Sequence, residues 1–317
     1  MAGTVLITGA NGTLALEVVR TLLTSHPQYT VVAAVRNTSP EKDLNTAKLM
    51  QIIEQPPGAK VEVKQLDLGK LSEVRRFADD ISRQIDLGNL PRISAILCNA
   101  ATLSLEAGQK YTSDGLEATF QVCHLSHYLL VLKLLGSMDM AYGRVIMLGS
   151  ITHFPEKTNP LSAYRPEFPS EIERLRYGTA KLANVTFMHD LNRRLEADPK
   201  LPNLTVLAVD PGGLAASRSQ VHMKKPVQRM MATINFLMPV LKHVTTMFRP
   251  TADAARDVVA VSVAPEFRSR RGYYVGQRAD VDAEISRDAG AQDRLWRACW
   301  GWSGLEPEET MLANAAA

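Results

Sequence analysis

The chain has 317 residues, of which 45% are hydrophobic and 22% are charged, so it can bury a sizeable core. Its 36 Lys and Arg against 33 Asp and Glu leave a net charge of +3 without a basic block, which argues against nucleic-acid binding. The three cysteines show neither metal-ligand spacing nor an even-numbered disulfide framework, and no signal peptide is recognisable. Because no apolar run reaches about 18 residues, no membrane-spanning segment is expected. A cytoplasmic protein without a metal site is predicted.

Short apolar runs alternate with helical patterns along the chain. The predicted strands are Val5–Ile7, Thr30–Asn37, a run ending near Leu66, Ile93–Ala101, Arg144–Ser150 and Leu204–Gly213. The predicted helices are Leu14–Leu23, about Ser39–Glu54 with Ser39 as its cap, Leu71–Ile81 and about Ser113–Met138. Strands that are apolar throughout and alternate with helices indicate an α/β fold, a doubly wound parallel sheet covered on both faces.

The same alternation of strands and helices predicts the domain organisation. We expect one domain over residues 1–305, with inserts at about 151–176 and 214–249 and a flexible tail at 306–317. Both inserts follow strand ends at the edge where such sheets bind ligands. The second contains the apolar stretch Met230–Leu241, which is interpreted as a buried or lid helix rather than a membrane-surface contact.

A glycine-containing loop, "TGANGTLA", separates the first predicted strand from the first helix. Gly9 suits a tight turn, Gly12 lets backbone approach a pyrophosphate, and the helix N-terminus offers N–H groups to phosphates. Many loops of this kind need glycine for backbone reasons alone, so this feature is weak evidence by itself.

Polar residues close the next strands. Arg36 stands where a carboxylate would bind the ribose of NAD, and it better suits the 2′-phosphate of NADP; the alternative is a solvated arginine. Asp67 could accept a hydrogen bond from an adenine amino group, or it could cap a helix. Asn99 would fix the loops beside the cofactor, or it is a satisfied turn residue.

The stretch "YGTAKLANV" places Tyr177 and Lys181 on one helix face, one turn apart. Ser150 ends the fifth predicted strand on the ligand-binding edge. A carbonyl oxygen held by the Ser and Tyr hydroxyls can receive a proton while carbon receives a hydride. A neighbouring ammonium, together with the positive nicotinamide of the oxidised cofactor, is expected to lower the pKa of the Tyr177 phenol from about 10.

These motifs, in this order, resemble the short-chain dehydrogenases/reductases. The likeness runs through "TGANGTLA", "CNAA", "YGTAKLAN", "DPGG", "RPTADAARDVV" and "GYYVG", and is greatest to the retinol-dehydrogenase and protochlorophyllide-reductase-like branch and, more loosely, to fungal secondary-metabolite reductases. The resemblance implies a Rossmann fold, a nicotinamide cofactor and a homodimer as one possible assembly. It implies Tyr177 as acid/base, Ser150 as the group orienting the substrate oxygen, and Lys181 as the tuning and ribose-binding residue. The implied NADP(H)-binding residues are Gly9, Asn11, Gly12, Thr13, Leu14, Arg36, Asp67, Leu68, Asn99, Ala100, Tyr177, Lys181, Pro211, Gly212 and Leu214.

Two departures from the family pattern stand out. Thr13 and Ala15 replace glycines of the usual cofactor loop, which also gives a spacing found in epimerase-like relatives. Cys123 stands where the family usually has a catalytic Asn that helps to hold a water near the Lys ammonium, and a thiol would support that water poorly. The proton relay then runs through His124, Ser126 or backbone, or catalysis is slow, or the protein has another role.

The expected function is an NADP(H)-dependent oxidoreductase, more readily a ketone or aldehyde reductase than an alcohol oxidase, acting on a fairly large apolar substrate. Alternatives are a cofactor-assisted isomerase or cyclase and a low-turnover NADP(H)-binding sensor. His153 is interpreted as a solvated loop residue or a proton shuttle, and His124 and His127 as packed or surface helix residues.

Overall fold

The central sheet of the computed structural model, which describes residues 2–102, 110–154, 176–214, 233 and 248–316, has eight strands in the order β10-β9-β6-β5-β4-β1-β2-β3. All neighbouring pairs are parallel except β9 and β10. The strands are β1 (Thr4–Thr8), β2 (Thr30–Val35), β3 (Val61–Gln65), β4 (Ile93–Cys98), β5 (Arg144–Leu148), β6 (Thr205–Asp210), β9 (Gly272–Val275) and β10 (Arg278–Ala279). This is the predicted doubly wound sheet, extended by two strands that the sequence patterns did not indicate.

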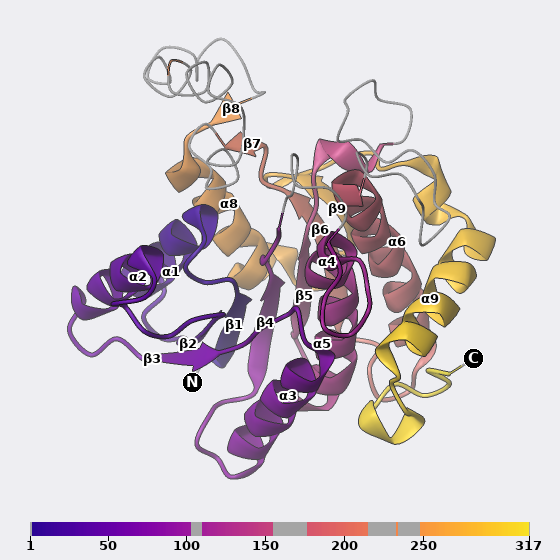
Figure 1. Cartoon of the computed structure of the whole chain (residues 1–317), viewed down its shortest axis with the longest axis horizontal. Helices are drawn as coiled ribbons and strands as arrows, with labels where there is room; N and C mark the ends of the chain where they lie inside the picture. The colour runs from indigo at the N-terminus through magenta and orange to yellow at the C-terminus, as the bar shows by residue number, and fades with distance from the viewer. Residues whose placement is uncertain (1, 103–109, 155–175, 215–232, 234–247, 317) are drawn as a thin grey trace.

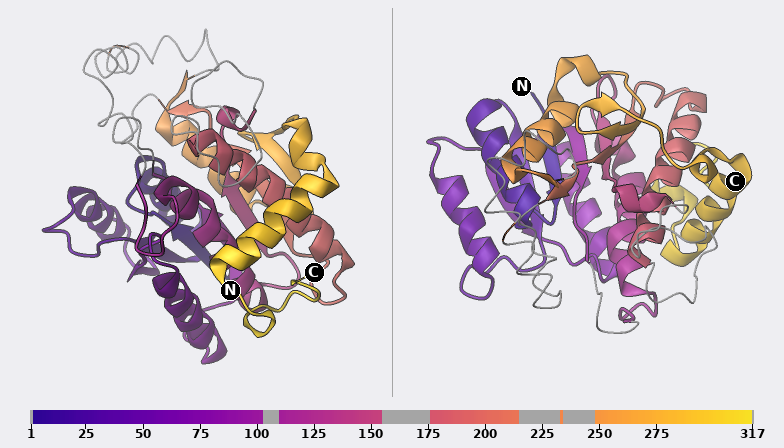
Figure 2. Two further views of the ribbon diagram at one scale, coloured as in Figure 1. Left: turned by 45° about the vertical axis from the view of Figure 1, so that its right-hand side comes forward. Right: turned by 90° about the horizontal axis from the view of Figure 1, so that it is seen from above.

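Helices cover both faces of the sheet (Figures 1 and 2). One layer contains α1 (Thr13–Ser25), α2 (Leu44–Glu54) and α8 (Thr251–Val263), whose apolar residues pack on β1, β2 and their neighbours. The other layer contains α3 (Leu71–Asp86), α5 (Ser126–Leu134) and α6 (Arg176–Ala197), with α9 (Ala289–Ser303) packed outside α6. Strands β1, β2, β4, β5 and β6 are almost completely buried between these layers, which is why their sequences are almost continuously apolar. The strands at the two edges of the sheet, β3 and β10, are partly or fully exposed.

Short elements complete the described part of the chain. They are α4 (Ala118–Phe120), the π-helical turn η1 (Gln121–Leu125), η2 (Leu135–Ser137), η3 (Ile151–His153), β7 (Gly213–Leu214), β8 (Phe248–Arg249), η5 (Pro265–Phe267), η6 (Glu284–Arg287) and η7 (Pro307–Glu309). The strands β7 and β8 pair with each other outside the main sheet. The inserts expected at 151–176 and 214–249, including the apolar stretch 230–241, lie mostly outside the described residues.

Three predictions about elements were wrong. The second helix begins at Leu44, and its cap is Asp43, whose side chain accepts from the Asn45 N–H at 2.9 Å, rather than Ser39. The long helix expected from Ser113 begins only at Ala118 and contains the π-helical turn. The tail 306–316 is packed on the core rather than flexible, with Leu312 and Ala315 buried.

The helix Ala118–Ser137 is the one described helix that is long and apolar enough to cross a membrane by these criteria alone. Most of it is buried inside the protein, as expected for the core helix between α3 and α6.

Candidate active site

The loop between β1 and α1 has the geometry of a phosphate-binding turn. Gly9 has a left-handed φ of 61°, and a Cβ there would lie 3.0 Å from the Ala100 Cα, so a side chain is excluded. Gly12 precedes α1 without a side-chain cap, which leaves the N-terminal turn of the helix open to an anion. The residues present therefore fit the pyrophosphate of a dinucleotide, although Thr13 and Ala15 replace the usual glycines.

Two asparagines hold this loop in place. The Asn99 amide donates to the carbonyls of Thr8 at 2.8 Å and Gly9 at 3.1 Å, as expected for a residue that fixes the loop. The Asn11 amide donates to Asp43 at 3.2 Å and to the Thr46 hydroxyl at 3.0 Å, and so ties the loop to the start of α2. The loop is thus prearranged by side chains from β4 and α2.

Arg36 and Asp67 lie at the same edge of the sheet. Arg36 directly follows β2 and is exposed, and no ion-pair partner is recorded for it within the described parts of the chain. Asp67 accepts from the Gly69 N–H at 2.9 Å, and α3 is preceded by Lys70, so the alternative of a helix-capping Asp67 is wrong. Its carboxylate closes a turn beside the predicted adenine position, next to the buried Leu68.

Ser150 precedes the 3₁₀ turn η3, and its hydroxyl accepts from the Thr152 N–H at 3.3 Å. His153 is completely buried: its Nδ1 lies 2.7 Å from the Ser150 carbonyl, and its Nε2 accepts from the Ala283 N–H at 3.2 Å. The ring also packs on Phe154 and Tyr273. The interpretation of His153 as a solvated loop residue was therefore wrong, because the ring joins the Ser150 turn to the loop before η6, and the proton-shuttle interpretation stays a prediction.

Tyr177 and Lys181 come from the first turns of α6, which packs on η3. The Lys181 ammonium lies 5.3 Å from the centroid of the Tyr177 ring and donates to the Leu148 carbonyl at 2.7 Å. Leu148 ends β5, two residues before Ser150. The three residues that the sequence nominated for catalysis are thus gathered where β5 ends and α6 begins.

The expected effect of Lys181 on Tyr177 is not found in the protein without cofactor. Burial raises the pKa of the Tyr177 phenol, and Cys123 and Asp210 act in the same direction. Burial also lowers the pKa of Lys181, against opposing effects of Cys123, Asp210 and Cys98. The expectation was wrong because desolvation disfavours both the Tyr177 phenolate and the Lys181 ammonium, and because the ammonium donates to the Leu148 carbonyl.

Of the groups considered for the proton relay, His124, Ser126 and backbone, the Ser126 hydroxyl is directed away from Lys181, and the Cys123 thiol has backbone partners of its own. The Cys123 thiol accepts from the Thr102 N–H at 3.3 Å and donates to the Thr102 carbonyl at 3.4 Å. The Ser126 hydroxyl donates to the Leu68 carbonyl at 2.7 Å. Asn184 was not predicted as a site residue from the sequence. Its position three residues after Lys181 in "YGTAKLANV" places it on the same helix face and could have indicated a role.

The segment after β6 closes the site. Pro211 is buried, and Gly212 has a left-handed φ of 80° with a Cβ position only 3.0 Å from Arg249. Arg249 forms an ion pair with Asp257 of α8, and β7, which contains Leu214, pairs with β8. These contacts hold the stretch Pro211–Leu214 directly after β6, whose end pairs with the end of β5.

Comparison with known proteins agrees with this geometry. The family model described as short chain dehydrogenase matches residues 3–165, and the AcuH dehydrogenase domain matches residues 220–312. The short-chain dehydrogenase iccH of Talaromyces variabilis is 30% identical over 98% of both chains. The WW domain-containing oxidoreductase of Drosophila melanogaster is 28% identical over 93% of this chain and 66% of its own.

Solved structures show the same fold. The angucycline C-6 ketoreductase LanV with bound NADP superposes with a TM-score of 0.62 at 16% identity, covering 86% of this chain and 93% of its own. Levodione reductase gives a TM-score of 0.61 at 17% identity, covering 87% and 95%. Together with the glycine loop and the Ser150, Tyr177 and Lys181 cluster, the full-length match to iccH shows that the chain belongs to the short-chain dehydrogenase/reductase family of oxidoreductases.

Proposed function

We propose that the protein is an NADP(H)-dependent reductase that interconverts a carbonyl and an alcohol on a fairly large apolar substrate. The observation that carries the proposal is the convergence of Ser150, Tyr177 and Lys181 where β5 ends, next to the loop suited to a pyrophosphate. A nicotinamide held there would supply or accept the hydride. The chain's own residues would hold the substrate oxygen and exchange its proton.

The Tyr177 phenol suits the role of proton donor in the reductive direction, because burial raises its pKa above the ordinary value and it is protonated near pH 7. A protonated phenol is the form that can donate a proton to a carbonyl oxygen as negative charge develops on it. The Ser150 hydroxyl would donate a hydrogen bond to the same oxygen. The buried Lys181 ammonium would stabilise the phenolate that remains.

The described rim of the site supports an apolar substrate. Ile151 is 57% exposed immediately after Ser150, and Val281 is 66% exposed on the loop that contacts His153 through Ala283. The exposed aliphatic side chain of Ile151, directly after Ser150, suits an apolar ligand that covers it. A place in secondary metabolism is part of the proposal, supported by the fungal origin of iccH and by the sequence resemblance.

The test is a Tyr177→Phe variant assayed for NADPH oxidation with a panel of apolar ketones and aldehydes. We expect turnover to fall at least about 100-fold because the proton donor is lost, while NADPH binding measured by fluorescence is retained. Tyr142→Phe is the matched control, since Tyr142 is exposed before β5 at the opposite edge of the sheet. Unaltered product formation in Tyr177→Phe would favour an isomerase or cyclase. NADPH binding by the wild type without oxidation by any carbonyl would favour a sensor.

A further inference from the structure

Lys181 shares its carbonyl partner with a neighbouring amide. Asn184, one turn further along α6 and 1% exposed, donates from Nδ2 to the Cys123 carbonyl at 3.2 Å and to the Leu148 carbonyl at 3.4 Å. The Leu148 oxygen also accepts from Lys181 at 2.7 Å, so the two nitrogens lie within about 6 Å of each other. We therefore expect a substitution of Asn184 to alter the position or the pKa of the Lys181 ammonium.

His124 fixes the orientation of this amide. Its Nδ1 lies 2.9 Å from Asn184 Oδ1, and its Nε2 lies 3.4 Å from the Cys299 sulfur on α9. An amide oxygen only accepts, so Nδ1 carries the proton, and Nε2 is left to accept from the Cys299 thiol. All three side chains are buried, and one assignment of protons satisfies every contact.

A second arm meets the first at the Cys123 carbonyl. His127 Nδ1 lies 3.3 Å from that carbonyl oxygen, and His127 Nε2 lies 2.9 Å from the Thr8 hydroxyl. The Thr8 oxygen accepts from the N–H groups of Asn99 and Ala100, both at 3.0 Å. The network therefore extends from the C-terminal helix α9 to the glycine loop, with Asn184 beside Lys181 at its centre.

We propose that Asn184 is a positioning residue for Lys181, and that His124 and Cys299 fix the orientation of the Asn184 side chain. Asn184 takes this role in a chain that has a cysteine at position 123. The proposal rests on the proposed reductase function, because the position of the Lys181 ammonium matters through Tyr177. By bridging two carbonyls, the amide limits where the ammonium can settle. A free Cys123 carbonyl would offer the ammonium a second hydrogen-bond acceptor.

The test uses Asn184→Asp, which keeps an oxygen for His124 but puts a carboxylate beside Lys181. The ionisable groups that otherwise face Lys181 are Cys98, Cys123, His127, Tyr177 and Asp210, and none is altered. The Lys181 titration is followed by NMR in full-length protein with ¹³Cε-labelled lysine, assigned with Lys181→Arg. We expect the pKa of Lys181 to rise by about 1 or more, because an opposite charge lies within about 6 Å.

The matched control is Asn192→Asp. Asn192 lies eight residues further along α6, about 12 Å away, is also buried, and bonds to the N–H and carbonyl of Val206. We expect the pKa of Lys181 to be unchanged in this control, even if Asn192→Asp lowers the stability of the protein as much as Asn184→Asp does. An equal response of Lys181 in both variants, or none in Asn184→Asp, overturns the proposal.

Kinetics give the second readout. With an active carbonyl substrate, Asn184→Asp should lower kcat about 10- to 100-fold and leave KM within about threefold, because positioning rather than binding is lost. The NMR readout needs no turnover, so a failure of the proposed reductase activity would leave this test intact. Conversely, a normal kcat together with a shifted Lys181 pKa would contradict the positioning role of Asn184 and leave the proposed reductase function standing.

A cysteine pair keeps the proposal testable if Asn184→Asp does not fold. Cys299→Ala removes the donor to His124, whereas Cys299→Ser keeps an O–H at that place. We expect the alanine variant to shift the Lys181 titration and lower kcat at least about threefold, and the serine variant to match the wild type. Identical behaviour of both variants and the wild type contradicts the link from α9 to Lys181.

Discussion

Arg36 is the residue on which the proposed preference for NADP(H) depends. It follows the last residue of β2, next to the loop that Asn11 and Asn99 hold in place. A guanidinium offers paired donors that match a phosphate, and a phosphate exists at this position only in the phosphorylated dinucleotide. The residue therefore supports NADP(H) over NAD(H) in the proposed function.

We predict that Arg36→Leu lowers the preference for NADPH over NADH by about 10- to 100-fold, because charge-assisted hydrogen bonds contribute about 1.5–3 kcal/mol each. The measurement is the ratio of kcat/KM for the two cofactors, or of their dissociation constants. Arg83→Leu is the control, since Arg83 is 70% exposed near the end of α3, where the chain turns to the opposite edge of the sheet. An unchanged ratio in Arg36→Leu would remove the argument for NADP(H).

At the scale of elements, the segment Ala118–Ser137 is the most informative. It contains the π-helical turn Gln121–Leu125, which brings the Cys123 carbonyl and the rings of His124 and His127 next to the β-strand ends. π-helical turns are often found at functional sites. Burial lowers the pKa of His124 to about 4 and that of His127 to about 3, so both rings are neutral near pH 7.

This segment predicts that acid destabilises the protein. Both folded-state pKa values lie below the ordinary value of 6.5, so the unfolded chain binds more protons and stability falls as the pH drops below 6.5 toward 4 and 3. Each histidine should contribute a loss of about 2 kcal/mol between pH 7.5 and pH 5. Urea unfolding at the two pH values measures the total.

The histidine contribution can be isolated by substitution. His124→Asn should reduce the pH-dependent loss by about 2 kcal/mol, because the titrating group is absent. His26→Asn, at a partly exposed position after α1, serves as the control and should leave the loss unchanged. A pH dependence that is the same in both variants contradicts the assignment.

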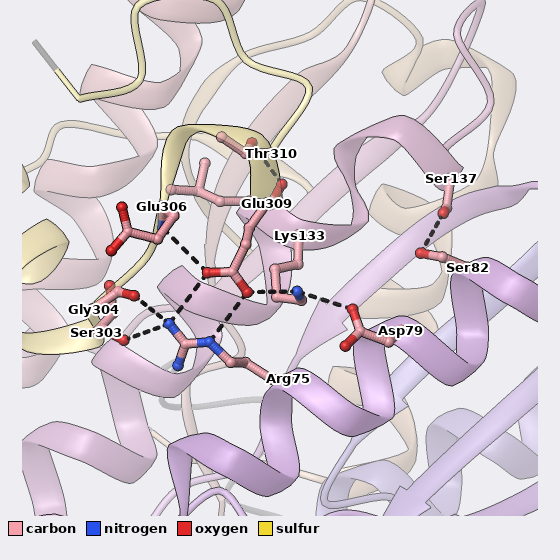
Figure 3. A network of polar contacts seen from close by, with 11 residues as sticks. Arg75, Asp79, Ser82, Lys133, Ser137, Ser303, Gly304, Glu306, Glu309 and Thr310 are labelled. Carbon is pink, nitrogen blue, oxygen red and sulfur yellow. Dashed lines mark hydrogen bonds and ion pairs between the residues drawn. The ribbon is translucent and has the colours of Figure 1, made fainter.

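At the scale of the whole molecule, the C-terminal segment joins elements that are far apart in sequence. Figure 3 shows Arg75 of α3 and Lys133 of α5 converging on Glu309, at 3.2 Å and 2.8 Å, with Asp79 2.9 Å from Lys133. These charges lower the pKa of Glu309 to about 2 against the opposing effect of its partial burial. The same segment and α9 pack on α5 and α6. The homodimer that the resemblance implies stays a prediction.

We predict that Glu309→Gln lowers the free energy of unfolding by about 1–2 kcal/mol, a figure kept modest because the pair is partly exposed. The loss arises because Lys133, whose side chain is 7% exposed, keeps only Asp79 as an ion-pair partner in the described parts of the chain. Glu308→Gln, at the exposed neighbouring position, should change stability by less than about 0.5 kcal/mol. Denaturant unfolding of both variants is the measurement. Equal free energies of unfolding would show that the ion pairs around Glu309 do not contribute to stability.

The sequence by itself determined the alternation of strands and helices, the glycine loop and the triplet Ser150, Tyr177 and Lys181. These features depend on local patterns: apolar runs, a turn that excludes a Cβ, and residues one helical turn apart. Its error at the start of α2 concerned which of two nearby residues caps the helix. Its error in the tail arose because the packing partners of the tail come from other parts of the chain.

Only the tertiary structure decided how the site is held and how its groups titrate. Asn184 meets His124 across 60 residues and His124 meets Cys299 across 175, and no periodicity in a sequence encodes such contacts. The raised pKa of Tyr177 likewise comes from burial, a property of the packed protein rather than of the Tyr–Lys spacing. Hydrogen bonding and desolvation depend on which elements surround a group, and that arrangement exists only once the chain has folded.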